Sequence, residues 1–78
     1  MSVMAKEIIT ESRKRVGARL RQIREEYGWT IEQVATMADV KPVTIGKIEE
    51  GVFNVPLDIL ARVAEVLDSE LVIRERKG

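Results

Sequence analysis

Hydrophobic side chains recur along the N-terminal third of the chain at steps of three and four residues, the spacing of one helix face. The first stripe consists of Val16, Leu20, Ile23 and Tyr27. Gly28 follows it at a position where helices commonly end, so a first helix should end near Tyr27. Ile9 and Ser12 continue the stripe upstream. The pattern leaves open whether this helix begins near Lys6 or whether a separate short helix precedes it.

A capping motif marks the start of a second helix. Thr30 and Gln33 stand just before an apolar run, so the threonine hydroxyl can accept from the third amide and the glutamine can reach back to the threonine amide. The pattern predicts a helix from about Ile31 to about Ala38. The helix should end there because Asp39 tolerates a left-handed backbone, and a proline shortly afterwards disfavours continuation.

Pro42 opens a third predicted helix after a tight turn. Ile45 and Ile48 share its inner face, and Gly51 supplies a stop. The outer side is left with small and polar residues, namely Val43, Thr44, Gly46 and Lys47. Two short helices joined in this way can lay the second one in the major groove of DNA, although an ordinary four-helix bundle can contain the same corner.

The last third of the chain predicts one more helix and a strand. Leucine and alanine recur with helical period from about Pro56 to Leu67. Residues 70–75 alternate in a β-branched pattern that predicts a short strand, with Leu71 and Ile73 on one face. The expected fold class is therefore all-α, a bundle of four to five helices containing a helix-turn-helix, plus a short C-terminal β-strand without a partner in this chain.

The composition argues against catalysis and against membrane insertion. The chain has 78 residues, enough for one domain whose core is marginal unless packing is good or a second subunit helps. Cysteine and histidine are absent, which removes disulfides and the usual transition-metal ligands. With no Gly-rich phosphate loop and no apolar run of membrane-spanning length, we expect a cytoplasmic protein that is not an enzyme and needs no cofactor or metal.

Charge is balanced overall but uneven along the chain. Thirteen basic and thirteen acidic residues give a net charge of zero, which counts against indiscriminate nucleic-acid binding. Six basic residues nevertheless lie in a stretch without any acid: Arg13, Lys14, Arg15, Arg19, Arg21 and Arg24. This stretch is either a field that sits beside phosphates or a solvated helix face, and charge alone does not choose between them.

Five short elements then follow one another almost without gaps. They are Arg24, Gly28-Trp29-Thr30, the run 35–40 (Ala-Thr-Met-Ala-Asp-Val), the run 44–51 (Thr-Ile-Gly-Lys-Ile-Glu-Glu-Gly) and residues 57–67. From Val16 to Leu67 the chain thereby resembles the Cro and phage-repressor (XRE-type) helix-turn-helix family. The resemblance implies a lambda-repressor-like bundle that binds double-stranded DNA as a homodimer on a pseudo-palindromic operator and regulates transcription as a repressor.

The resemblance also implies roles for individual residues. Arg24 near the end of the first helix should pair with Glu49 near the end of the third, as a planar two-point contact. The implied base-contacting residues are Lys41, Val43, Thr44, Gly46 and Lys47. The implied phosphate contacts are Thr30, Ile31 and Arg21, with backbone amides at the start of the second helix contributing.

Three departures from the family pattern reduce the expected number of phosphate contacts. Ile31 stands where glutamine is frequent, Glu50 where asparagine is common, and Val52-Phe53 where basic residues are frequent. An exposed apolar group of Ile31, Val52, Phe53 and Val55 would instead suit a protein partner, unless Phe53 folds back onto the core. The alternative function is therefore an antitoxin or adaptor whose main partner is a toxin or another protein.

The C-terminal strand is similar to that of a family subset, including some antitoxins, in which the strands of two subunits pair across the dyad. By this resemblance Leu71, Val72 and Ile73 form the dimer interface; the alternative is a frayed tail. The expected organisation is a helical N-terminal extension over residues 1–15, a DNA-binding domain over 16–67, and a dimerisation element over 68–78.

Overall fold

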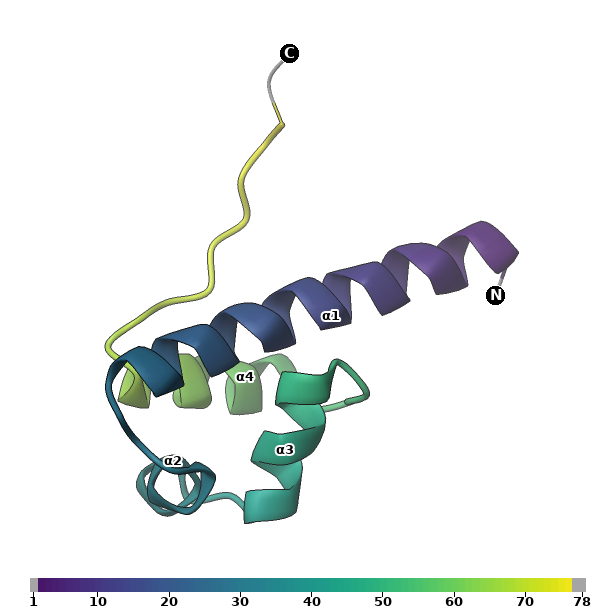
Figure 1. Cartoon of the computed structure of the whole chain (residues 1–78). Coiled ribbons are helices and arrows are strands. Elements are labelled where there is room, and N and C mark those ends of the chain that lie inside the picture. The colour runs from purple at the N-terminus through teal and green to yellow at the C-terminus, as the bar shows by residue number, and fades with distance from the viewer. Residues whose placement is uncertain (1, 77–78) are drawn as a thin grey trace.

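The computed structural model describes residues 2–76 and contains four helices in that range. They are α1 (Val3–Glu26), α2 (Ile31–Ala38), α3 (Pro42–Glu50) and α4 (Leu57–Val66). Figure 1 shows α1 as a long rod, with the three short helices gathered beside its C-terminal half and its N-terminal turns projecting beyond them. The helical fold class expected from the sequence is confirmed. No helix in this range is both long and apolar enough to cross a bilayer.

The first helix is continuous, which resolves where it begins. Ser2 caps it by accepting a hydrogen bond from the Ala5 amide at 3.1 Å, and the helix then runs without interruption to Glu26. The predicted extension over residues 1–15 is, as far as it is described, the first half of the same helix. Gly28 follows with a φ of 71°, a left-handed conformation that glycine adopts without steric cost.

A single hydrophobic core joins all four helices. Its buried members are Leu20, Val34, Ala35, Ala38, Ile45, Ile48, Phe53, Val63, Ala64 and Leu67. Phe53 is only 8% exposed, while Ile31 and Val55 pack against the core from its edge. The predicted exposed apolar group is therefore not formed, because Phe53 is buried, Ile31 and Val55 are partly buried against the core, and only Val52 is exposed.

Two glycines permit the close approach of α1 to the end of α3. A Cβ atom on Gly17 would lie 2.0 Å from the carbonyl oxygen of Ile48. A Cβ on Gly51 would lie 2.7 Å from the Cα of Lys14, and Gly51 also has a φ of +76°. Backbone thus meets backbone where the helices cross, and neither position has room for a side chain.

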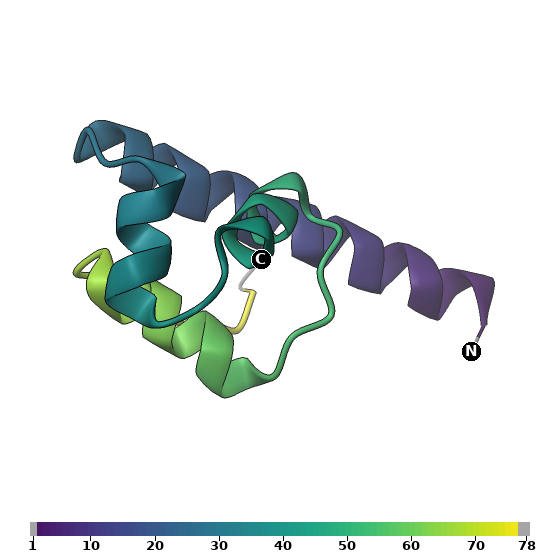
Figure 2. The same cartoon turned by 90° about the horizontal axis from the view of Figure 1, so that it is seen from below.

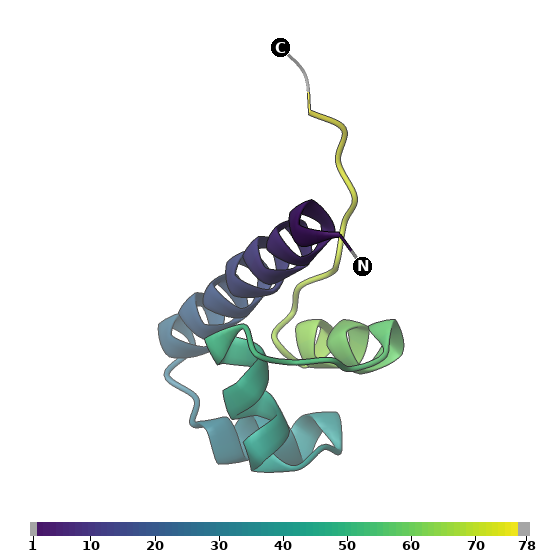
Figure 3. The ribbon, with the colours of Figure 1, turned by 90° about the vertical axis from the view of Figure 1, so that its right-hand side faces the viewer.

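The C-terminal strand is not formed in the described residues. After Leu67 the chain turns at Asp68 and continues to residue 76 without strand structure. Figure 3 shows this tail rising away from the three short helices beside α1. The prediction fails for a physical reason: alternation favours an extended backbone, but a strand exists only when a second strand completes its hydrogen bonds.

Candidate nucleic-acid interface

The connection between α2 and α3 is short and conformationally fixed. Asp39 ends α2 with φ 57° and ψ 49°, in the left-handed region expected from the sequence, and its amide bonds back to the Thr36 carbonyl. Lys41, exposed, is the N-cap of α3, and Pro42 occupies the first turn. Figure 2 shows α3 in a view down much of its length, with α2 on one side and the chain leading to α4 on the other.

The outer face of α3 presents the residues implied as base contacts. Val43 and Lys47 are exposed, and Thr44 and Gly46 are partly exposed. Glu50 is exposed as well, one turn beyond Lys47 and two turns beyond Val43, so it belongs to the same face. The family pattern marks Glu50 only as a departure, although its spacing of seven from Val43 places it on this face.

A groove runs beside this face. It has a volume of about 370 Å³ and is bounded by Thr44 and Lys47 on α3 and by residues 52–55 of the following loop. Asn54 is an exposed member of that loop and adds an amide donor and acceptor to the surface. Periodicity along the chain does not predict Asn54, because it does not show how a loop folds around a buried Phe53.

The N-terminus of α2 carries a complete capping box. The Thr30 hydroxyl accepts from the Gln33 amide at 3.1 Å, and the Gln33 side chain accepts from the Thr30 amide at 2.8 Å. Within residues 2–76 no acceptor is found for the amides of Ile31 and Glu32. Those two N–H groups, rather than that of Thr30, are the donors this helix end can offer to an anion.

Arg24 joins three parts of the fold through one guanidinium group. Its Nε and Nη2 donate to the two carboxylate oxygens of Glu49 at 2.7 and 2.9 Å, and its Nη1 donates to the Trp29 carbonyl at 2.7 Å. The Arg24 and Glu49 side chains are only 12% and 6% exposed. The structure therefore contains the implied ion pair, which ties the end of α1 to the α1–α2 loop and to the last turn of α3.

The electrostatics of this pair favour a permanently charged arginine. The hydrogen bonds to Glu49 raise the pKa of Arg24 above its ordinary value, although burial acts in the opposite direction. Trp29, whose carbonyl accepts from Arg24, stacks its ring on that of Tyr27 with ring centroids 5.4 Å apart. An arginine is charged near neutral pH in any case, so the pair acts as a fixed clamp behind the outer face of α3.

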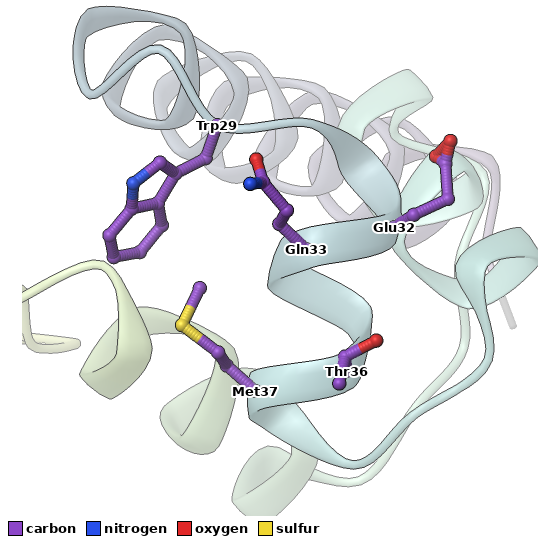
Figure 4. Close-up of a pocket in the computed structure, with 5 residues that line it drawn as sticks. All are labelled: Trp29, Glu32, Gln33, Thr36 and Met37. Atoms are coloured by element: carbon purple, nitrogen blue, oxygen red, sulfur yellow. The ribbon is translucent and has the colours of Figure 1, made fainter.

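Beyond Trp29 lies a largely apolar hollow of about 470 Å³ on the solvent side of α2. Figure 4 shows the Trp29 indole and the Met37 thioether on two sides of it, with Gln33 next to Trp29 on α2 and Glu32 and Thr36 further round the helix. The hollow begins directly beside the N-terminus of α2. Trp29 is the only tryptophan of the chain, so its fluorescence can report on this end of the interface.

The basic stretch of α1 is spread around the helix. Arg21 is exposed, and its guanidinium lies 3.7 Å from Glu25 in an i,i+4 pair. Lys14 lies against Gly51 at the end of α3, whereas Arg24 forms the buried ion pair with Glu49. The stretch therefore has mixed roles, and Arg21, one turn before Arg24, is the member implied as a phosphate contact.

A model of the helix-turn-helix family matches residues 20–73, more than two thirds of the chain. The chain belongs to this helix-turn-helix family. The Cro and phage-repressor (XRE) type expected from the sequence is thereby confirmed.

Relatives and solved structures agree with the family assignment. Two proteins named as HTH-type transcriptional regulatory proteins, from Pyrococcus furiosus and Pyrococcus abyssi, are 36% and 32% identical over 56 residues. The match covers 72% of this chain but only 18% of each relative, so the chain spans less than a fifth of their length.

Two solved structures share the fold. The restriction-modification controller protein C.AhdI from Aeromonas hydrophila superposes with a TM-score of 0.72 at 30% identity, over 77% of this chain and 91% of that one. The clp gene regulator ClgR from Corynebacterium glutamicum gives a TM-score of 0.70 at 31% identity, over 74% and 62% of the two chains.

Proposed function

We propose that this helix-turn-helix chain binds double-stranded DNA and regulates transcription, as a homodimer on a pseudo-palindromic operator. The observation that carries the proposal is α3, which follows a fixed turn, is held from behind by the Arg24–Glu49 pair and turns Val43, Lys47 and Glu50 outward. A short helix presented in this way fits the major groove of B-DNA.

Each outward residue of α3 has a matching partner on base edges. Lys47 can donate to O6 or N7 of guanine, Thr44 to a base edge or a phosphate, and Val43 suits the methyl group of thymine. Glu50 can accept from the amino group of cytosine. Its negative charge also penalises misplaced phosphates, which favours sequence-dependent over indiscriminate binding.

Phosphate contacts would come from the flanks of this face. The free amides of Ile31 and Glu32 lie at the positive end of the α2 dipole, and Arg21 supplies an exposed cation. Because Glu32 places a carboxylate at the same helix end, the attraction for phosphate is weaker than the amides alone would give. We therefore propose moderate affinity that falls with salt as the few phosphate contacts release counterions.

Repression is the regulatory outcome we propose, because a dimer seated in the major groove excludes other proteins from the operator. Leu71, Val72 and Ile73 are the proposed dimer contact. The alternative of an antitoxin or adaptor rested partly on an exposed apolar group, but Phe53 is buried and Ile31 and Val55 are partly buried against the core. A DNA-binding regulator is therefore the function that the surface supports best.

Selection of bound duplexes from a random library tests this proposal. We expect a palindromic sequence to be enriched, with half-sites about one helical turn apart. The double variant Thr44→Ala, Lys47→Ala should lose about 100-fold in affinity for the selected site, since each base contact contributes about 1–3 kcal/mol. Arg62→Ala, on the exposed side of α4, is the matched control. No enrichment at any salt concentration would contradict the proposal.

Gly46 offers a separate test because stability and binding should respond in opposite directions. A Cβ at Gly46 would meet nothing within 4 Å, so Gly46→Ala should stabilise the fold by about 1 kcal/mol through helix propensity. If the glycine serves close approach to DNA, the same methyl group should lower operator affinity about tenfold or more. Urea unfolding and titration of Trp29 fluorescence measure the two effects. Unchanged affinity would remove Gly46 from the interface.

A further inference from the structure

The C-terminal tail carries a charge pattern that the proposed function does not use. Leu71 packs against the core, whereas Val72 and Ile73 are 72% and 101% exposed. Glu70 and Arg74, on either side of these residues, are exposed, and neither forms an ion pair within residues 2–76. The tail is thus an apolar segment with one acid before it and one base after it.

We propose that this tail pairs with the tail of a second copy of the chain. The two tails run antiparallel, and the dyad axis passes through Val72. The inference rests on the proposed homodimer and deepens it by assigning the register of the interface. It follows from symmetry and from the order of apolar and charged residues from Glu70 to Arg74.

Symmetry restricts the possible registers. In an antiparallel pair, successive residue pairs alternate between hydrogen-bonded and non-hydrogen-bonded types. A two-fold axis that passed between two neighbouring residues would have to exchange a hydrogen-bonded pair with a non-hydrogen-bonded pair. Those two pairs are not equivalent, so such an axis is impossible. The axis must pass through a residue that faces its own copy, and within the apolar segment that residue is Leu71, Val72 or Ile73.

The match of charged with charged and of apolar with apolar residues then selects among the three registers. With the axis at Val72, Glu70 faces Arg74 of the second copy, and symmetry repeats this pair. Leu71 faces Ile73 of the second copy, so the apolar residues on that face also meet each other. Every charged position that has a charged partner therefore meets the opposite sign.

The neighbouring registers are poorer. An axis at Leu71 places the carboxylate of Glu70 opposite Val72, and an axis at Ile73 places Leu71 opposite Glu75 and Val72 opposite Arg74. Apolar and charged side chains then face each other, which forfeits the cross-strand contacts that stabilise a sheet. The Val72 register is the one in which both kinds of pairing are satisfied.

A cysteine scan measures the register directly, because the chain contains no cysteine of its own. On the axis, the two Cα atoms lie about 4.5–5.5 Å apart, within the range of a disulfide. One residue away, the symmetry-related Cα atoms are about 8 Å apart, beyond that range. Under mild oxidation, Val72→Cys should cross-link at least tenfold faster than Leu71→Cys or Ile73→Cys. Arg62→Cys, exposed on α4, sets the rate for random collisions.

Reversing the charges of Glu70 and Arg74 tests whether their pairing across the axis stabilises the dimer. Glu70→Arg and Arg74→Glu should each raise the dimer dissociation constant about tenfold, because each places two like-charged pairs across the axis. An equimolar mixture of the two variants should dimerise again as a heterodimer, since every facing pair is then opposite in sign. Glu75→Arg changes the charge by the same amount but faces Ser69, so it is the matched control. Sedimentation equilibrium measures all four samples, and circular dichroism verifies folding.

The outcomes separate this inference from the proposed function. Fastest cross-linking at residue 71 or 73, or a mixture that fails to dimerise, would overturn the Val72 register. Cross-linking no faster than that of Arg62→Cys would remove the tail from the interface, while an enriched palindrome in the duplex selection would leave a dimeric regulator standing. Cross-linking at Val72 without any enriched duplex would leave the register standing and overturn DNA binding.

Discussion

Replacing Gly17 by alanine is expected to lower the free energy of unfolding by about 3 kcal/mol, at the upper end of overpacking effects. The new Cβ would lie 2.0 Å from the Ile48 carbonyl oxygen and 3.1 Å from that of Glu49. Both contacts are to backbone, which cannot rotate away as a side chain can. The gain of about 1 kcal/mol in helix propensity is too small to offset this clash, so α1 and α3 must separate.

Urea denaturation followed by circular dichroism measures this effect. Gly46→Ala is the matched control, because it is the same substitution in a helix but meets open space. The two variants should therefore move the unfolding midpoint in opposite directions. Equal midpoints would contradict the close crossing of α1 and α3. The Gly17 variant should also bind DNA poorly, because the crossing positions α3.

Removing either partner of the Arg24–Glu49 pair should cost about 3–5 kcal/mol, the range for breaking a buried ion pair. Arg24→Ala leaves the Glu49 carboxylate 6% exposed without its cation, and it also leaves the Trp29 carbonyl without a donor. Glu49→Ala leaves a buried guanidinium. Arg24→Lys should recover only part of the loss, because an ammonium group cannot make three planar contacts at once.

The exposed Arg21–Glu25 pair provides the control for this experiment. Its partners are 57% and 58% exposed and 3.7 Å apart, so Arg21→Ala should cost under about 0.5 kcal/mol. Replacing both Arg24 and Glu49 by leucine should cost less than either single alanine substitution, since no uncompensated charge remains. A Glu49→Ala loss as small as that of Arg21→Ala would mean that the pair is not a clamp.

The expected losses of stability in both experiments come from the same place, the contact between α1 and the end of α3. Gly17 lies at the carbonyls of Ile48 and Glu49, and Arg24 grips the side chain of Glu49 two turns further along α1. The end of α3 is therefore fixed by backbone contact at one point and by charge at the other. Disturbing either should change the angle at which the outer face of α3 is presented, and hence DNA affinity as well as stability.

Local signals in the sequence determined most of the helix boundaries. The Thr30–Gln33 capping box predicted the start of α2, and the structure contains both of its hydrogen bonds. Asp39 and Gly51 both adopt the left-handed conformation that ends a helix. These features depend on residues within one turn of each other, so their physics is complete in the sequence. The outer face of α3 followed from helical period for the same reason.

The Arg24–Glu49 pair could also be predicted from the sequence, but only through its resemblance to a family. Twenty-five residues separate the partners, and no local rule brings them together. The same limit applies to Asn54 and to the fate of Phe53. Whether an apolar residue in a loop is buried depends on the space left by other elements, which periodicity does not describe.

What the sequence determined by itself is therefore local: where helices begin and end, which faces are apolar, and which charges flank the tail. What only the tertiary structure decided is distant: that Gly17 lies against a carbonyl of α3, that Phe53 completes the core, and that residues 70–75 form no strand within the described part of one chain. A capping hydrogen bond needs only its neighbours, whereas a helix crossing needs a partner elsewhere in the fold. A strand needs a second strand to bond with, and for this tail we propose that it comes from another copy of the chain.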